Sequence, residues 1–205
     1  AFEIFRQVRN AVHLPVTAKV RIGWDSSPAC REDFLRLIEL LYDGGINAVT
    51  VHGRTVHQHY RGRSDSTSIA ELKRLFPNLT LIASGDVRDE AAAVQRLREG
   101  ADAVAVARGA VGNPWIFARI RALFAGRALP EHPSLVEQRG VIERHLAMAS
   151  ELYGVDHALR RLRKFWVQYA RLHPRWREVQ QAFTLVRTVE QWLPILHEFY
   201  GSAKE

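Results

Sequence analysis

The chain has 205 residues, which is enough for one or two domains with a sizeable core. Its 29 Lys and Arg residues outnumber 22 Asp and Glu residues, giving a formal net charge of +7 and favouring a polyanionic partner, nucleic acid before membrane. Cys30 is the only cysteine, which excludes an intrachain disulfide and favours a reducing, cytoplasmic location. No apolar run approaches the length of a membrane span, so no membrane partner is expected.

Strands and helices alternate along the first 125 residues, after an opening helix at 2–12. The pattern predicts strands at 15–22, 46–51, 79–83 and 103–107, and helices after them at 31–42, 68–75, 89–98 and 114–123. This alternation predicts a parallel sheet. Four such βα units make half of a (β/α)8 TIM barrel.

A linker rich in Gly and Pro follows at 126–133, and beyond it the periodicity is helical only. The predicted helices cover 135–153, 158–172, 175–184 and 189–200. We therefore expect two domains, a partial barrel at 1–125 and an all-α domain at 134–205. A half-barrel leaves two open sheet edges and an unfilled interior. We expect either that the chain is a fragment of a longer protein, monomeric when full length, or that two half-barrels pair.

Polar residues stand where the predicted strands end. They are Lys19, His52, Ser84, Gly85, Asp86, Ala107 and Arg108. The carboxyl ends of parallel strands meet at one rim, and barrels place their chemistry there. Gly85 would let backbone amides approach an anion, and Arg108 could bind it bidentately. These residues are expected to converge on one anionic ligand, although Lys19 could instead point outward between strand and helix.

The loop after the second strand carries His57 and His59 soon after His52. Their spacing is not typical of a zinc site, so no metal is expected and the two loop histidines are interpreted as surface residues. A nucleophilic role for Cys30 is not expected, because no histidine is near it in sequence.

The helical domain contains a concentrated basic stretch, with eight cations and two anions between residues 155 and 187. Arg160, Lys164 and Arg171 fall on one helix face, opposite apolar residues that should pack inward. A charged outer face is usually only solvated. Here the near-absence of anions favours a phosphate-binding ridge, which Arg175 and Arg177 extend.

Several of these segments together resemble the tRNA-dihydrouridine synthases, flavin enzymes that reduce selected uridines of tRNA. The matching segments are 15–25, 51–55 through Tyr60, 84–86, 108–110 running to 114–115, and 160–169. The resemblance covers essentially the whole chain and leans toward the bacterial C-type branch, which implies uridine 16. It implies the second half of the barrel, FMN as cofactor, NADPH as reductant and tRNA as partner.

The resemblance also implies roles for individual residues. Lys19 and His52 would contact the flavin ring and its ribityl or phosphate side, whereas the FMN phosphate would be held by Ser84, Gly85, Asp86, Ala107 and Arg108. The implied tRNA contacts are Arg54, Tyr60, Arg61, Arg160, Arg163, Lys164, Arg171 and Arg175. The catalytic cysteine that donates a proton is expected upstream of Ala1, so the chain alone is not expected to turn over.

Two departures from the family pattern concern the phosphate end. Ser84 stands where the family usually has Asn, and Ala107 where it usually has Gly. Both changes are expected to lower flavin affinity. Two other functions stay open: another FMN-dependent barrel oxidoreductase such as a dihydroorotate dehydrogenase, and a non-catalytic RNA-binding remnant.

Overall fold

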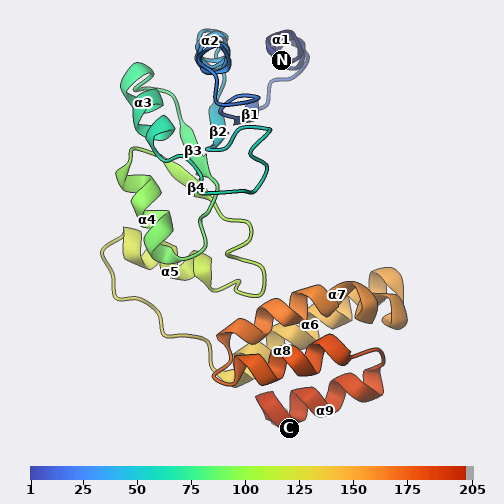
Figure 1. The fold of residues 1–205 in the computed structure, drawn as a ribbon. Helices are drawn as coiled ribbons and strands as arrows, with labels where there is room; N and C mark the ends of the chain where they lie inside the picture. Colours follow the sequence, from blue (N-terminus) through green and yellow to red (C-terminus); the bar gives the residue numbers. More distant parts are fainter. Residues whose placement is uncertain (202–205) are drawn as a thin grey trace. The chain divides into compact units, whose positions relative to one another are not determined.

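The computed structural model describes residues 1–201, which form two compact units (Figure 1). The first unit is Ala1–Arg108, and the second begins at Gly109. The residues at 109–125, which the sequence assigned to the barrel domain, therefore group with the second unit. The change of unit falls directly after the last strand and not in the Gly- and Pro-rich linker at 126–133.

The first unit contains a four-stranded parallel sheet in the order β1-β2-β3-β4. Its strands are β1 (Thr17–Arg21), β2 (Ala48–His52), β3 (Leu81–Ser84) and β4 (Ala103–Ala105). Each neighbouring pair is parallel, so every connection is a crossover through a helix. The predicted fold class is confirmed: successive βα units as in a partial TIM barrel, followed by an all-helical region.

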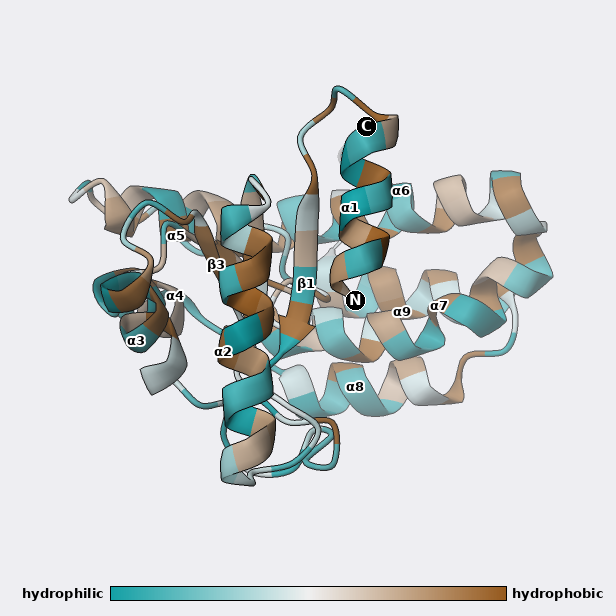
Figure 2. Cartoon of the chain, turned by 90° about the horizontal axis from the view of Figure 1, so that it is seen from above, coloured by the Kyte–Doolittle hydropathy of each residue, from teal (hydrophilic) through white to brown (hydrophobic). Residues whose placement is uncertain are grey.

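The helices of this unit are α1 (Phe2–Ala11), α2 (Pro28–Asp43), α3 (Thr67–Leu75) and α4 (Glu90–Arg98). Helix α2 begins where the Ser27 hydroxyl accepts a hydrogen bond from the Cys30 amide, with proline as its first residue. Figure 2 shows brown and teal residues alternating around α2, the pattern of a helix with one buried face. Asp89 caps α4 by accepting from the Ala92 amide at 2.7 Å.

The core of the first unit lies on one face of the sheet. Side chains of α1, α2 and α3 pack there against Val49, Val51, Leu81 and Ala83. Because side chains alternate along a strand, the residues between them point to the other face. That second face carries the polar ends of the strands.

The second unit is helical throughout its described residues. It comprises α5 (Ile116–Phe124), α6 (Leu135–Tyr153), α7 (Val155–Tyr169), the 3-10 turn η1 (Ala170–Leu172), α8 (Trp176–Leu185) and α9 (Val189–Tyr200). The helix predicted at 158–172 begins earlier and ends at Tyr169, so Arg171 lies in η1 and not on α7. Its early start depends on Gly154, which ends α6 and begins α7 at a φ of +75°.

Helices α6 to α9 share one core of large side chains, with Trp166 and Phe183 fully buried at its centre. This core has no residue in common with the core of the first unit. Within the described part of the chain, no helix has both the length and the apolar composition needed to cross a bilayer.

Candidate functional site

The ends of the four strands are aligned in one row across the sheet. Arg21 pairs with His52, His52 with Ser84, and Ser84 with Ala105. A recess of about 180 Å³ opens at this row, here called the strand-end recess. Its lining consists of Lys19, His52, Tyr60, Ser84, Gly85, Asp86, Val87, Arg88, Ala105, Ala107 and Arg108. All seven residues expected to converge are among them, and the alternative for Lys19, an outward position, does not occur.

Gly85 is required by the geometry of the recess. Its φ is +107°, a conformation that residues with a side chain rarely adopt. A Cβ at this position would lie 2.6 Å from the Ser64 hydroxyl oxygen and 2.9 Å from Cδ2 of His52. The turn after β3 therefore packs against the loop after β2 only because residue 85 is glycine.

Arg54 is buried beneath the recess, with 1% of its surface exposed. Its guanidinium forms an ion pair with Asp86 and donates to the Gly62 carbonyl at 2.8 Å. Because Arg54 is buried and its two Nη atoms already contact His52, Gly62 and Asp86, this conformation does not present the side chain to tRNA, and the expected tRNA contact stays a prediction. Arg54 instead ties the loop after β2 to the turn after β3.

The Asp86 carboxylate binds protein groups on both of its oxygens. One oxygen accepts from Arg54 and from the Ser64 amide, and the other pairs with Arg108 at 2.9 Å. Burial raises the pKa of Asp86, but the Ser64 amide and the two guanidinium groups outweigh it and hold the pKa below its ordinary value. Asp86 lines the recess as expected, and its side chain holds two arginines in place.

The surroundings of His52 favour the neutral form of its imidazole. Burial lowers its pKa, and the charges of Lys19, Arg21 and Arg54 lower it further. Its Nε2 lies 3.3 Å from Nη1 of Arg54, and since a guanidinium only donates, Nε2 accepts and the proton is on Nδ1. His52 therefore offers the recess a neutral ring.

The loop after β2 covers one side of the recess. Arg21 holds this loop by donating to the Thr55 carbonyl at 2.7 Å. Tyr60 is 65% exposed, and the Arg108 guanidinium lies 5.1 Å from the centre of its ring. Arg61 is exposed nearby. His57 packs edge-on against Trp24, and no cluster of three or more potential metal ligands occurs among residues 1–201.

The basic residues of the second unit differ in their exposure and in whether a carboxylate pairs with them. Arg160, Lys164 and Arg171 are exposed and Arg163 is half-buried, and none of the four forms an ion pair with a described carboxylate. Arg175 differs, because Glu178 pairs with it at 2.6 Å and its guanidinium lies over the Phe199 ring. The expected ridge (Arg160, Lys164 and Arg171) is thus available to an anion, whereas the charge of Arg175 is largely satisfied.

Some residues near these surfaces were not identified from the sequence. Arg88 lines the recess and is only two positions after Asp86, so its place in the turn could have been found. The role of Ser64 could not have been found from the sequence, because its amide hydrogen-bonds to Asp86, a residue 22 positions away. In the second unit, Tyr153 and Arg161 come together across the α6–α7 corner, which the late predicted start of α7 concealed.

The family model described as Dihydrouridine synthase (Dus) matches residues 1–203. tRNA-dihydrouridine synthase B of Xanthomonas campestris pv. campestris is 35% identical over 200 residues, 97% of this chain and 59% of the relative. A probable tRNA-dihydrouridine synthase of Mycobacterium leprae is 33% identical over 190 residues, covering 92% of this chain and 49% of the relative. tRNA-dihydrouridine synthase B of Vibrio cholerae is 32% identical, covering 98% and 61%.

The chain thus spans between about half and three fifths of the length of these relatives. Two of the three carry the letter B in their names, so they lend no support to the expected C-type branch. The family itself agrees with the resemblance that the strand-end motifs indicated. With a family model matched along nearly its entire length, the chain belongs to the dihydrouridine synthase family.

Proposed function

We propose that the protein containing this chain is a tRNA-dihydrouridine synthase that binds FMN, takes reducing equivalents from NADPH and reduces a uridine of tRNA. The observation that carries the proposal is the convergence of Lys19, His52, Gly85 and Arg108 on one recess at the strand ends. A recess at this edge of a parallel βα sheet is where such folds bind phosphate and perform chemistry. Family membership supports the same reaction class.

The residues present fit the phosphate end of FMN. Lys19, Arg88 and Arg108 give the recess three cations against the one carboxylate of Asp86. In the loop hydrogen bonds of the described residues, the amides of Gly85, Ala107 and Arg108 do not act as donors, so they are available to an anion. The recess is smaller than the roughly 300–1,000 Å³ of a complete small-molecule site, which suits the phosphate end alone.

Each residue then has a defined task in this proposal. Arg108 donates to the phosphate from its unpaired nitrogens while Asp86 fixes its orientation. Lys19 and the ring of His52 line the recess and would contact the flavin. Bound FMN would supply the hydride for the uracil ring. The proton donor is proposed to be a cysteine outside these 205 residues, because Cys30 does not line the recess.

Binding of tRNA is proposed to use Tyr60 and Arg61 beside the recess and the ridge of the second unit. These side chains are exposed and, in the ridge, lack described carboxylate partners. Unpaired surface cations favour a polyanion through release of its counterions. Uridine 16 and a cytoplasmic location remain predictions.

The test is flavin binding and product formation by the intact protein that contains this chain. We expect FMN binding in a fluorescence titration, and NADPH-dependent dihydrouridine in unmodified tRNA. Lys19→Ala and Arg108→Ala should each weaken FMN binding about tenfold or more, because each removes a charged hydrogen-bond donor. Arg36→Ala, which removes an exposed cation on α2, serves as the control. Mapping the dihydrouridine position by primer extension tests uridine 16.

The two other functions give different results. A protein that binds FMN but reduces a free small molecule and ignores tRNA would be another FMN-dependent barrel oxidoreductase. A protein that binds tRNA but takes up no flavin and forms no dihydrouridine would be an RNA-binding remnant. Either result would refute the proposed reaction.

A further inference from the structure

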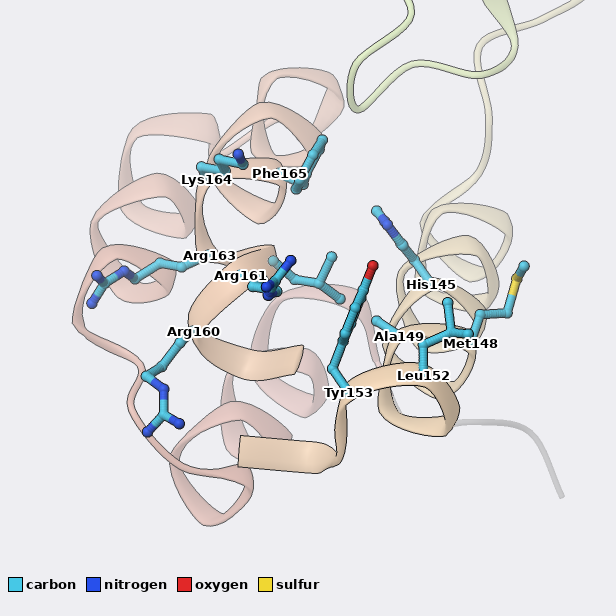
Figure 3. Close-up of a pocket in the computed structure, with 11 residues that line it drawn as sticks. His145, Met148, Ala149, Leu152, Tyr153, Arg160, Arg161, Arg163, Lys164 and Phe165 are labelled. Atoms are coloured by element: carbon cyan, nitrogen blue, oxygen red, sulfur yellow. The ribbon is translucent and has the colours of Figure 1, made fainter. Parts of the chain in front are cut away.

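A groove of about 730 Å³ lies between α6 and α7, within the second unit. Figure 3 shows His145, Met148 and Leu152 on the α6 side and Arg161, Lys164 and Phe165 on the α7 side. This groove, here called the α6–α7 groove, is within the roughly 300–1,000 Å³ range of sites that hold small molecules. Its lining combines aromatic rings, aliphatic side chains and cations without a carboxylate.

One part of the groove's lining is an aromatic ring with a cation beside it. Tyr153 is the last residue of α6 and is 47% exposed. The Arg161 guanidinium lies 4.4 Å from the centre of the Tyr153 ring, although the residues belong to different helices. The left-handed conformation of Gly154 turns the chain between the helices in one residue and so brings this pair together.

Another part of the lining is a pair of rings, His145 and Phe165, that contact each other and lie next to Tyr169. His145 lies edge-on to Phe165 with 5.4 Å between ring centres, and its Nδ1 is 3.3 Å from the Tyr169 hydroxyl. Tyr169 is buried, which anchors the cluster in the core. These contacts order the rings before a ligand binds, so a planar ligand would not have to order them.

The charges around the groove select the class of ligand. Arg160, Arg161, Arg163 and Lys164 all line it, and Arg160 and Arg163 extend away from Tyr153 at its edge (Figure 3). No carboxylate of the described residues forms an ion pair with any of the four. Aromatic faces beside uncompensated cations suit a base and its phosphate, since bases stack on rings and phosphates meet arginine.

We infer that the α6–α7 groove is a stacking site for one unpaired nucleotide of RNA, with the base against Tyr153 and the phosphate held by Arg161. A base within a duplex has both faces covered by its neighbours, so only an unstacked nucleotide can use the groove. This inference rests on the proposed function, because it takes tRNA as the partner. It adds a contact with an RNA base to the second unit, whose basic ridge is otherwise expected to bind only the phosphate backbone of the RNA.

The test compares two RNA probes on the intact protein: a six-nucleotide single-stranded oligouridine and a blunt duplex with the same number of phosphates. Tyr153→Ala should weaken oligouridine binding about tenfold, the usual effect of losing one stacked base, and leave duplex binding unchanged. Tyr153→Phe keeps the ring and should bind as the unchanged protein does. Trp176→Ala is the control, because Trp176 is also an exposed ring beside an arginine but does not line the groove.

Salt dependence separates stacking from charge. Tyr153→Ala should leave the slope of log affinity against log salt concentration unchanged, whereas Arg161→Gln should reduce its magnitude by about 0.7 for a single strand. Circular dichroism of each variant checks that α6 and α7 are intact.

The outcomes distinguish this inference from the proposed function. Dihydrouridine formation and tRNA binding by the unchanged protein, together with normal oligouridine binding by Tyr153→Ala, would overturn the stacking site alone. Two other results would also overturn it. One is an equal loss of oligouridine and duplex binding in Tyr153→Ala; the other is displacement of bound oligouridine from the protein by NADPH. Failure of the unchanged protein to bind any RNA would refute both proposals.

Discussion

Asp86 and Arg54 illustrate how a single pair of residues can organise the strand-end recess. The Arg54 side chain is only 2% exposed, so its charge is compensated mainly by Asp86. Replacing Asp86 with Asn would leave a buried cation without its partner and release Arg108 as well. We expect Asp86→Asn to lower the free energy of unfolding by about 3 kcal/mol, measured by chemical denaturation.

The matched control for that variant is Glu3→Gln, which breaks the exposed ion pair between Glu3 and Arg6. Solvent screens this pair, so the control should unfold as the unchanged protein does. Equal stability of Asp86→Asn and the control would show that the network does not hold the recess together.

Gly85 gives a prediction in which conformation and space act together. We expect Gly85→Ala to cost about 1–3 kcal/mol in stability because of its backbone conformation. It should also abolish most FMN binding, because the added methyl collides with Ser64 and His52. Gly45→Ala is the control: its φ of +75° is also unfavourable, but nothing lies within 4 Å of the new Cβ. Unchanged flavin affinity in Gly85→Ala would contradict the proposed phosphate cradle.

His52 gives a prediction about pH. Its pKa in the folded protein lies below the ordinary value of 6.5, because burial and Lys19 disfavour its charged form. Protonation therefore favours the unfolded state, and the contribution of His52 to stability is lost as the pH falls below about 6.5 through the folded pKa. Lys19→Ala should raise the pKa of His52, measured by NMR titration of the ring protons.

Arg36→Ala, which removes a distant exposed cation, should leave that pKa unchanged. A pKa of His52 that stays the same in Lys19→Ala would mean that Lys19 does not act electrostatically on the recess.

At the scale of elements, the exposed face formed by α7 and η1 is the proposed contact with the RNA backbone. Reversing the charges of Arg160, Lys164 and Arg171 to Glu should weaken tRNA binding at least a hundredfold at low salt and flatten its salt dependence. The control reverses three exposed cations of the first unit, Arg36, Arg74 and Arg98. Similar affinities of the two triple variants in filter binding would remove the ridge from the proposed interface.

The elements also show where sequence patterns succeed. Strand and helix order was predicted for both units, because apolar periodicity reflects which face each element buries. The C-terminal end of α7 was missed because apolar spacing continues through Leu172 while the backbone tightens to a 3-10 turn after Tyr169. Its start was missed because a single glycine can end one helix and begin the next.

At the scale of the whole molecule, the two units have separate cores with no residue in common. A ligand stabilises only the structure that it binds, so FMN should protect one unit and not the other. We expect hydrogen exchange to slow in β1 to β4 on addition of FMN, with α6 to α9 unchanged. Short single-stranded RNA should slow hydrogen exchange in α6 and α7, which form the proposed stacking groove. Equal protection of both units by FMN would contradict independent stabilisation.

The sequence by itself determined the order of the elements, the resemblance to the family, and seven of the residues that line the strand-end recess. It could do so because strand ends in a parallel sheet share one edge, so residues at those ends are brought together by topology alone. The burial of Arg54 was not predicted for the complementary reason, because its position in a loop did not reveal that its side chain is enclosed.

Only the tertiary structure decided which charges are free and which are already paired. Asp86 pairs with Arg54 and Arg108, and Arg175 pairs with Glu178. The Tyr153 ring contacts Arg161. Each contact depends on where the fold places the side chains, which the sequence pattern did not reveal. A residue's type and spacing fix its chemistry, but burial and the nearest opposite charge fix whether that chemistry is available to a ligand.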